Sequence, residues 1–205
     1  MSLILQGFLT SRRRARALQS GSGRIVVRSL RSAAGFALID LLFVCGIISL
    51  LCGIAMPRLM AAKGSAMAAS AISTLRVISS GQVTFAITCG SGFYAPSLTT
   101  LGKPPAGQSE GFIKGDLAMT DVVVKSGYTF QIFSTPFGGA PDTCNQIGAG
   151  MTGLAFKAGG DPLDIQNNTR YFASNAGNTI WEDSASLFGA IPESGDPPTG
   201  RPLQR

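Results

Sequence analysis

The residue whose type and position most suggest chemistry is Asp40, a lone acid inside an apolar run. Residues 36–56 form a stretch of 21 residues in which Asp40 is the only charged one. As a helix this stretch would be about 31 Å long, enough to cross the hydrocarbon core of a bilayer. A carboxylate at that depth costs several kcal/mol unless a cation pairs with it. The sequence therefore predicts a membrane-spanning helix whose Asp40 requires a positively charged partner.

The four cysteines fall into two pairs. Cys45 and Cys52 lie seven residues apart on one face of the apolar helix, where cysteine usually serves as a small apolar residue. Cys89 and Cys144 lie in the part of the chain that we expect to be exported, and an exported compartment is oxidising. The sequence therefore predicts a Cys89–Cys144 disulfide.

The remaining acidic residues give weaker signals. Asp161 and Asp164, like Glu182 and Asp183, lie in loop or strand-end contexts, where solvated surface charge is the ordinary explanation. The spacing of Asp161, Asp164 and Asn167 fits no standard calcium loop. The chain has no histidine, the commonest general base and metal ligand, and no C-x-x-C pair. We therefore expect no enzyme activity, no cofactor and no metal site.

A single long helix has to position Asp40. Proline removes a backbone donor and clashes with the preceding turn, so Pro57 predicts a helix break, with a kink or local melting. Residues 58–71 are dense in good helix formers, and the helix should therefore resume and run to about residue 88. Apolar or small residues at helical spacing make this second part amphipathic: Ala68, Ala71, Ile72, Leu75, Ile78, Gln82, Val83 and Ala86.

The charge distribution predicts the orientation of this helix. Residues 1–35 contain seven arginines and no acid, whereas residues 36–205 contain ten basic and eleven acidic residues, a net charge of −1. Arginine-rich flanks stay in the cytoplasm, so residues 1–35 are expected to be a cytoplasmic leader and the C-terminal part to be translocated. A nearly neutral body also argues against nucleic acid as a partner, because such binding depends on basic contacts to phosphate.

Strand signals follow the helix. The segment Tyr128–Phe133 is aromatic and β-branched, and residues 151–156 form a second, weaker candidate. Residues 169–173 and 179–182 flank a turn at residues 175–178, which predicts a β-hairpin.

The rest of the chain predicts loops. Residues 90–127 should be a long connector with a short helix near residues 110–119, and proline, glycine and charge predict a loose tail over residues 192–205. The expected class is α+β, with a long N-terminal helix on a small antiparallel sheet. The expected parts are a leader (1–35), a membrane helix (36–56), its amphipathic continuation (57–88), a head (89–191) and the tail.

Together, Gly35, Phe36, Asp40, the apolar span and Pro57 resemble the type IV pilin and type II secretion pseudopilin superfamily. The usual signature of that family is Gly, then Phe, three more residues and Glu, opening an apolar helix with proline at the twenty-second mature position. With Phe36 as the first mature residue, Asp40 is the fifth, where the family usually has Glu, and Pro57 is the twenty-second. The resemblance implies a lollipop fold with an antiparallel head.

The resemblance also implies a role for each matched residue. A prepilin peptidase would cut after Gly35, and Phe36 would become a methylated N-terminus. Asp40 would pair with the α-amino group of a neighbouring subunit, and the apolar helices would pack in a filament core. The implied partners are sister subunits, the prepilin peptidase and methyltransferase, and an inner-membrane assembly platform.

The implied location is the inner membrane, with the N-terminus cytoplasmic and the head periplasmic, followed by an extracellular or periplasmic filament. Three versions of this role stay open. The chain could be a structural pilus subunit, a pseudopilin of a type II secretion system, or a minor pilin whose head binds in adhesion or DNA uptake.

Overall fold

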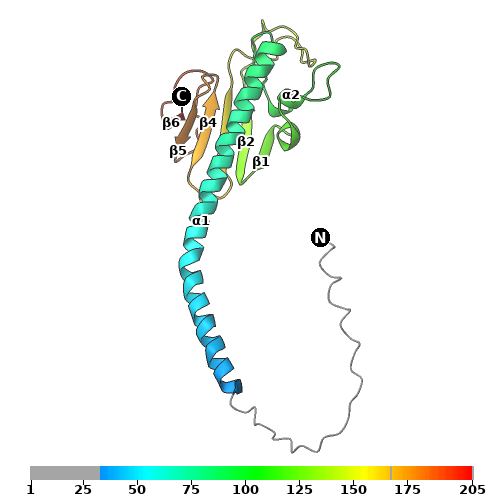
Figure 1. Ribbon diagram of the computed structural model, residues 1–205. Coiled ribbons are helices and arrows are strands. Elements are labelled where there is room, and N and C mark those ends of the chain that lie inside the picture. The colour runs from blue at the N-terminus through cyan, green and yellow to red at the C-terminus, as the bar shows by residue number, and fades with distance from the viewer. Residues whose placement is uncertain (1–32, 167, 205) are drawn as a thin grey trace, which may run out of the picture. The chain divides into compact units, whose positions relative to one another are not determined.

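The structure is a computed structural model that describes residues 33–166 and 168–204 (Figure 1). The expected leader, residues 1–35, falls almost wholly outside this described part. The chain divides into two units, residues 1–51 and residues 52–205. The elements are α1 (Ala33–Thr88), α2 (Leu98–Gly102), the 3₁₀ helix η2 (Gly115–Ala118), β1 (Val122–Lys125), β2 (Tyr128–Phe133), β3 (Lys157–Pro162), β4 (Tyr171–Asn175), β5 (Ile180–Asp183) and β6 (Arg201–Gln204).

Helix α1 is continuous through Pro57. The local melting predicted at this residue was therefore wrong, because helical structure continues on both sides of it. Proline removes only the one hydrogen bond that its missing N–H would donate to the carbonyl of Gly53. The turns on both sides are rich in leucine, methionine and alanine, which favour helix, so they keep their own hydrogen bonds and the helix tolerates the loss.

The head is a six-stranded antiparallel sheet in the order β1-β2-β3-β4-β5-β6, so every strand pairs with its neighbour in the sequence. The predicted strand Tyr128–Phe133 is β2. The predicted hairpin is formed by β4 and β5, with Ala173 opposite Trp181 and Phe172 opposite Glu182. The combination of helix and antiparallel sheet confirms the α+β class.

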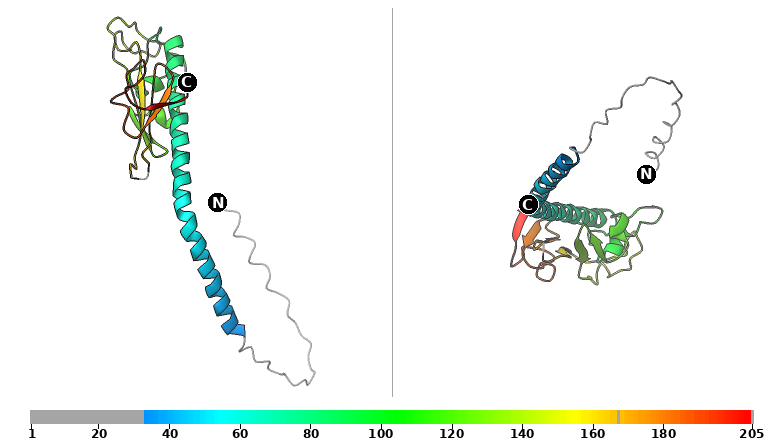
Figure 2. Two further views of the ribbon diagram at one scale, coloured as in Figure 1. Left: turned by 90° about the vertical axis from the view of Figure 1, so that its left-hand side faces the viewer. Right: turned by 90° about the horizontal axis from the view of Figure 1, so that it is seen from below.

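The second part of α1 lies across one face of the sheet (Figures 1 and 2). The helix buries a face at the predicted spacing, which includes Ala68, Ala71, Leu75, Ile78 and Gln82. Against this face lie the inward residues of the strands, among them Val123, Tyr128, Phe130, Ile132, Ala158, Phe172 and Ile180. This packing is the main core of the head.

A second, smaller core covers part of the other face of the sheet. It consists of Ala173, Trp181, Leu187 and Ile191. The chain after β5 therefore folds back over strands β4 and β5 instead of leaving the sheet.

One strand prediction and one loop prediction were wrong. Residues 151–156 form no strand; Gly153 makes only isolated bridges, to Tyr94 and Pro136. The tail is not loose, because β6 pairs with β5 and completes the sheet. The loop before β6 is held by Asn175, whose Nδ2 donates to the carbonyls of Pro192 (3.1 Å) and Gly195 (2.6 Å).

The connector also differs from its prediction. Where a short helix was expected near residues 110–119, the structure has only the 3₁₀ helix η2, and the α-helical turn lies earlier, at α2. The start of α2 is stabilised by Ser97, whose side chain accepts from the N–H of Thr100 as an N-cap.

Candidate membrane and assembly segment

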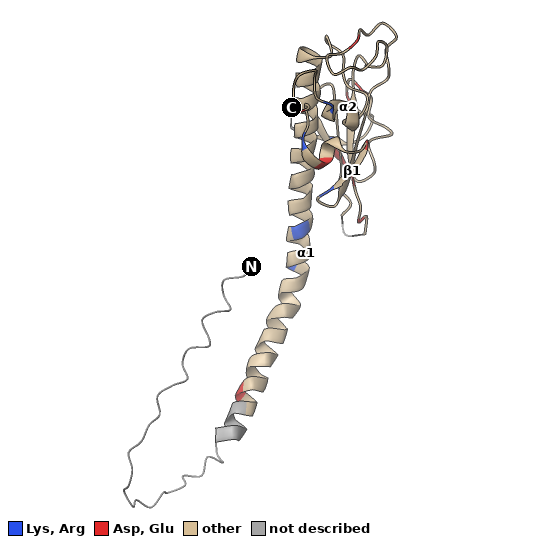
Figure 3. Ribbon diagram, turned by 90° about the vertical axis from the view of Figure 1, so that its right-hand side faces the viewer, with Lys and Arg blue, Asp and Glu red and all other residues tan. Residues whose placement is uncertain are grey.

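Residues 38–63 of α1 are all exposed. Their backbone N–H and C=O groups belong to the hydrogen-bonded helix, so the exposed surface is that of the side chains. Their large apolar side chains, from Leu38 to Met60, find no cover in the described part of the chain. By length and composition α1 can cross a membrane. Figure 3 shows that acidic and basic residues are scarce along this part of the helix. Exposed apolar surface of this extent needs a bilayer or other helices to cover it.

Asp40 is exposed near the start of α1. Among the side chains described for residues 38–166 and 168–204, none forms a hydrogen bond or ion pair with its carboxylate. Gly35 and Phe36 belong to the helical backbone of α1, while the Phe36 side chain lies outside the described part. Phe36 and Asp40 are four residues apart, so they share one face of the helix. The structure thus places the three predicted residues on the first two turns of one element.

The predicted disulfide between Cys89 and Cys144 is present, with 4.9 Å between the Cα atoms. It joins the residue that follows α1 to the long loop before β3. The backbone supports the same junction, because the N–H of Cys144 donates to the carbonyl of Cys89 (3.3 Å). Cys45 and Cys52 are free and exposed on α1. The disulfide therefore fixes the C-terminal end of α1 to the head, at the opposite end of the helix from the apolar segment.

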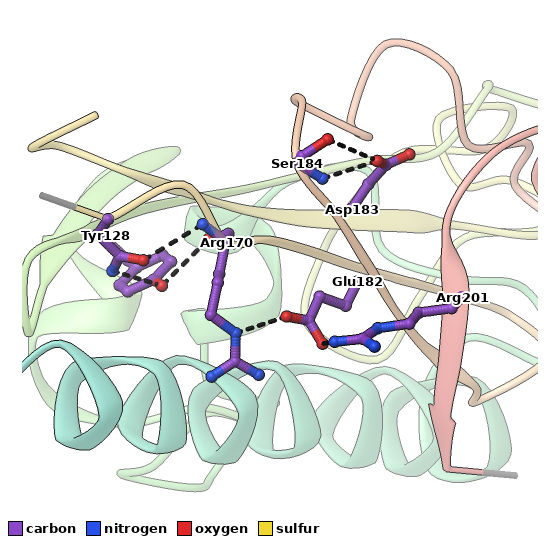
Figure 4. Close-up of polar contacts among 7 residues, drawn as sticks. Tyr128, Arg170, Glu182, Asp183, Ser184 and Arg201 are labelled. Carbon is purple, nitrogen blue, oxygen red and sulfur yellow. Dashed lines mark hydrogen bonds and ion pairs between the residues drawn. The ribbon is translucent and has the colours of Figure 1, made fainter. Parts of the chain in front are cut away.

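A polar cluster lies on the helix-facing side of the sheet, and sequence reasoning missed it (Figure 4). The Glu182 side chain is only 6% exposed and accepts from two arginines, Nε of Arg170 (2.5 Å) and Nη2 of Arg201 (3.1 Å). The arginines are more open, at 43% and 75% exposed. The Arg170 hydrogen bond lowers the pKa of Glu182 despite burial, which acts to raise it, and the Arg201 contact lowers it further.

The cluster continues from Arg170 to Tyr128. The hydroxyl of Tyr128 donates to the carbonyl of Arg170 (3.1 Å) and accepts from Nδ2 of Asn168 (2.7 Å). Burial raises the pKa of Tyr128, and the Asn168 hydrogen bond partly offsets that effect. These bonds connect β2, the loop before β4, and β5. The arginine on β6 then ties the C-terminal strand to the same network.

The chemistry open to this cluster is limited. A cavity of about 500 Å³ lies beside it, lined by Arg170, Glu182, Asp183 and Arg201 among others. Both oxygens of Glu182 are occupied by guanidinium groups, so this carboxylate is held as an anion and is a poor proton carrier. Within the described residues, no three potential ligands among His, Cys, Asp and Glu gather at one place. The geometry indicates a structural ion-pair network.

One sequence signal could have identified this network. The predicted hairpin turn at residues 175–178 fixes the register of β4 and β5, and that register places Phe172 opposite Glu182. Since Phe172 is apolar, its face of the sheet is the buried one, and Glu182 must share it. A buried glutamate requires a cation, and Arg170 lies two residues before Phe172. Glu182 is therefore not the solvated surface acid that its strand-end position suggested.

Comparisons of the sequence with protein-family profiles, with characterised proteins and with solved structures found no match. The assignment of function therefore rests on the exposed segment of α1, on Asp40 and on the contacts of the head.

Proposed function

We propose that this protein is a structural subunit of a type IV pilus or a related filament, synthesised as a prepilin and cut after Gly35. The observation that carries the proposal is the exposed apolar stretch at residues 38–60 with the exposed carboxylate of Asp40 near its start. This stretch leads without interruption into a helix that packs on an antiparallel sheet. A pilin-like fold, in which the same helix serves as anchor and as filament core, accounts for both parts.

The apolar surface is covered in two successive environments. Before assembly it lies in the bilayer, where an uncut chain stays as a single-pass anchor with its head on the far side. After assembly the same side chains pack against helices of sister subunits. Van der Waals contact drives that packing, because lipid chains are as apolar as the side chains they replace.

Asp40 supplies the register of assembly. Cutting after Gly35 creates an α-amino group at Phe36, which is a cation at the same depth as the carboxylate. Side chains on a helix lean toward its N-terminus, so Asp40 points to the level where these amines lie. An acid near a helix start is also stabilised by the helix dipole. Pairing between neighbours then neutralises two charges that would each be costly in an apolar core.

The proposed partners follow from these steps. A prepilin peptidase and methyltransferase acts at Gly35 and Phe36, an inner-membrane platform extracts the subunit, and sister subunits receive it. The proposed location is the inner membrane with a periplasmic head, then a filament. The subunit has no catalytic role. A pseudopilin of a type II secretion system, or a minor pilin, would use the same segment in the same way.

Substitution of Gly35 tests this proposal. In a strain that carries a prepilin peptidase, Gly35→Leu should keep the whole leader, because an extended peptidase cleft has no room for the side chain. Gly46→Leu is the control: it adds the same side chain to the same helix, where a new Cβ meets nothing within 4 Å. Intact mass and N-terminal sequencing read the outcome. A Gly35→Leu chain that still begins at Phe36 would refute the proposal.

A further inference from the structure

Two large apolar side chains are exposed on the connection between β3 and β4. Leu163 is 55% exposed and Ile165 is 56% exposed. The connection lies at the lower end of the sheet in Figure 1, the end at which α1 meets the head. Neither residue contributes to the two cores of the head. Both side chains are therefore open to a partner outside the described chain.

The loop presents these side chains from a firm backbone. The N–H of Leu163 donates to the carbonyl of Gly127 (3.0 Å), on the turn between β1 and β2. Asp164 closes the loop from within: its Oδ1 accepts from the N–H of Gln166 (3.2 Å), and its carbonyl accepts from the N–H of Asn168 (3.0 Å). Leu163 and Ile165 are thus exposed on a loop whose backbone is hydrogen-bonded on both sides of them.

The loop sits at the level of α1 that directly follows the apolar segment. A cavity of about 240 Å³ is lined by Met60, Lys63, Gly64 and Met67 from the helix and by Asp164 and Asn168 from the loop. Four residues of helix rise about 6 Å, so Met60 lies about 6 Å beyond Met56. The polar layer of a bilayer is about 5–8 Å thick on each side. The loop therefore begins where the headgroup layer would end.

The charges around this level suit a lipid surface. Arg58 and Lys63 are both exposed on the helix, within or just above that layer. The acid of the loop, Asp164, lines the same cavity as Lys63 and so faces the helix, while the two apolar side chains on either side of it remain open. Exposed apolar residues next to lysine or arginine are the combination that binds the boundary of an anionic bilayer.

We propose that, before assembly, the head docks on the bilayer surface through Leu163 and Ile165, with Arg58 and Lys63 at the lipid phosphates. The inference rests on the proposed function, because it requires α1 to be a membrane anchor. It adds a second membrane contact, made by the head itself. The contact would hold the head at one tilt and one rotation relative to the membrane until the subunit is extracted.

Depth-dependent fluorescence quenching tests the docking. The full chain carries Trp181→Phe, which removes the only native tryptophan, and receives one new tryptophan at a time. Each variant is reconstituted into phosphatidylcholine vesicles with and without phosphatidylglycerol, and brominated lipid is the quencher. Leu163→Trp and Ile165→Trp report on the loop, and either one suffices if the other fails to fold. Leu154→Trp is the matched control, since Leu154 is as exposed but precedes β3 at its opposite end.

Leu50→Trp, inside the apolar segment, reports anchoring separately. We expect strong quenching at position 50 and none at position 154. Quenching at position 163 or 165 should lie between these two, since interfacial groups reach about 5–10 Å into the boundary. Phosphatidylglycerol should increase quenching at the loop. Quenching at position 50 without quenching at either loop position would overturn the docking and leave the anchor intact. No quenching at any position would overturn both. Loop tryptophans that become shielded only in filaments would assign this surface to a second copy, and would also overturn the docking.

Discussion

Replacement of Glu182 by Gln tests the ion-pair network that joins the loop before β4 to β5 and β6. The substitution keeps the shape of the side chain and removes its charge. Its amide oxygen can still accept from one arginine, but its amide nitrogen then faces the other guanidinium, which is also a donor. One of the two contacts to Arg170 (2.5 Å) and Arg201 (3.1 Å) must therefore be lost.

The expected loss lies between two limits. Breaking a fully buried ion pair costs about 3–5 kcal/mol, whereas an exposed pair contributes about 0.2–1 kcal/mol. Glu182 is 6% exposed, but Arg170 and Arg201 are 43% and 75% exposed, so water screens much of the attraction. We expect Glu182→Gln to lower the free energy of unfolding by about 1–2 kcal/mol, a value between these two limits.

The same network makes the stability depend on pH. The pKa of Glu182 is lowered in the folded protein from its usual value of 4.5, chiefly by the Arg170 hydrogen bond. A lowered carboxyl pKa stabilises the fold above the unfolded value, and this contribution disappears as the pH falls below 4.5 through the folded value. The difference between the original protein and Glu182→Gln should therefore be full near pH 7 and shrink below pH 4.5.

Urea unfolding in detergent measures both effects, with the emission of the single tryptophan, Trp181, as the probe. Asp183→Asn is the control, because it removes a charge at the next position. Its Oδ1 accepts from the N–H of Ser184 (2.7 Å), a bond that an asparagine oxygen can also make. Equal losses from both substitutions, or a Glu182→Gln difference that does not change between pH 7 and pH 3, would refute the assignment of stability to this network.

Two further predictions concern the junction of α1 with the head. Replacement of both Cys89 and Cys144 by serine should lower the free energy of unfolding by about 4 kcal/mol, because it opens a loop with a sequence separation of 55 residues. Unfolding of the original protein with and without reductant gives the comparison. An unchanged free energy of unfolding would contradict the prediction. Gln82→Leu should cost about 1–3 kcal/mol, because it leaves the N–H and carbonyl of Ala95 without the side-chain partners that they have at 2.9 and 2.8 Å. Gln108→Leu, at an exposed position, is its control. An equal loss there would contradict a stabilising role for the two Gln82–Ala95 hydrogen bonds.

The elements that could be predicted from the sequence are those with a strong local pattern. The buried face of α1 follows from helical spacing, and Leu75 and Ile78 lie on it as expected. Strand β2 alternates in burial as its residues alternate in polarity. The disulfide followed from two cysteines in the part of the chain that was expected to be exported.

The elements that escaped prediction depend on distant contacts. Strand β3 contains Gly159 and Gly160, which carry no strand signal by themselves. A side chain at Gly159 would meet the ring of Phe188 at 2.8 Å, and one at Gly160 would meet Phe130 at 3.0 Å. The centre of the sheet thus needs glycine because residues from other elements fill the space.

Strand β6 escaped for a related reason. Its tail is rich in proline and glycine, and only the open edge of β5 gives it a place to pair. The ion pair of Arg201 with Glu182 then holds it there. The prediction for Asp40 is of another kind. Its expected partner is the α-amino group of a neighbouring subunit, which the structure of a single chain does not contain.

The most direct test of the account is the yield of filaments from variants of Asp40. Filaments are sheared from cells in which the variant is the only copy of this subunit, and their protein is compared with the cell-associated pool. Asp40→Glu should assemble as well as the original or better, while Asp40→Ala should lose most of its filaments, since the N-terminal amine then stays unpaired in an apolar core. Asp196→Ala, an exposed acid of the head, should have no effect. Equal filament yield from Asp40→Ala would contradict the central claim.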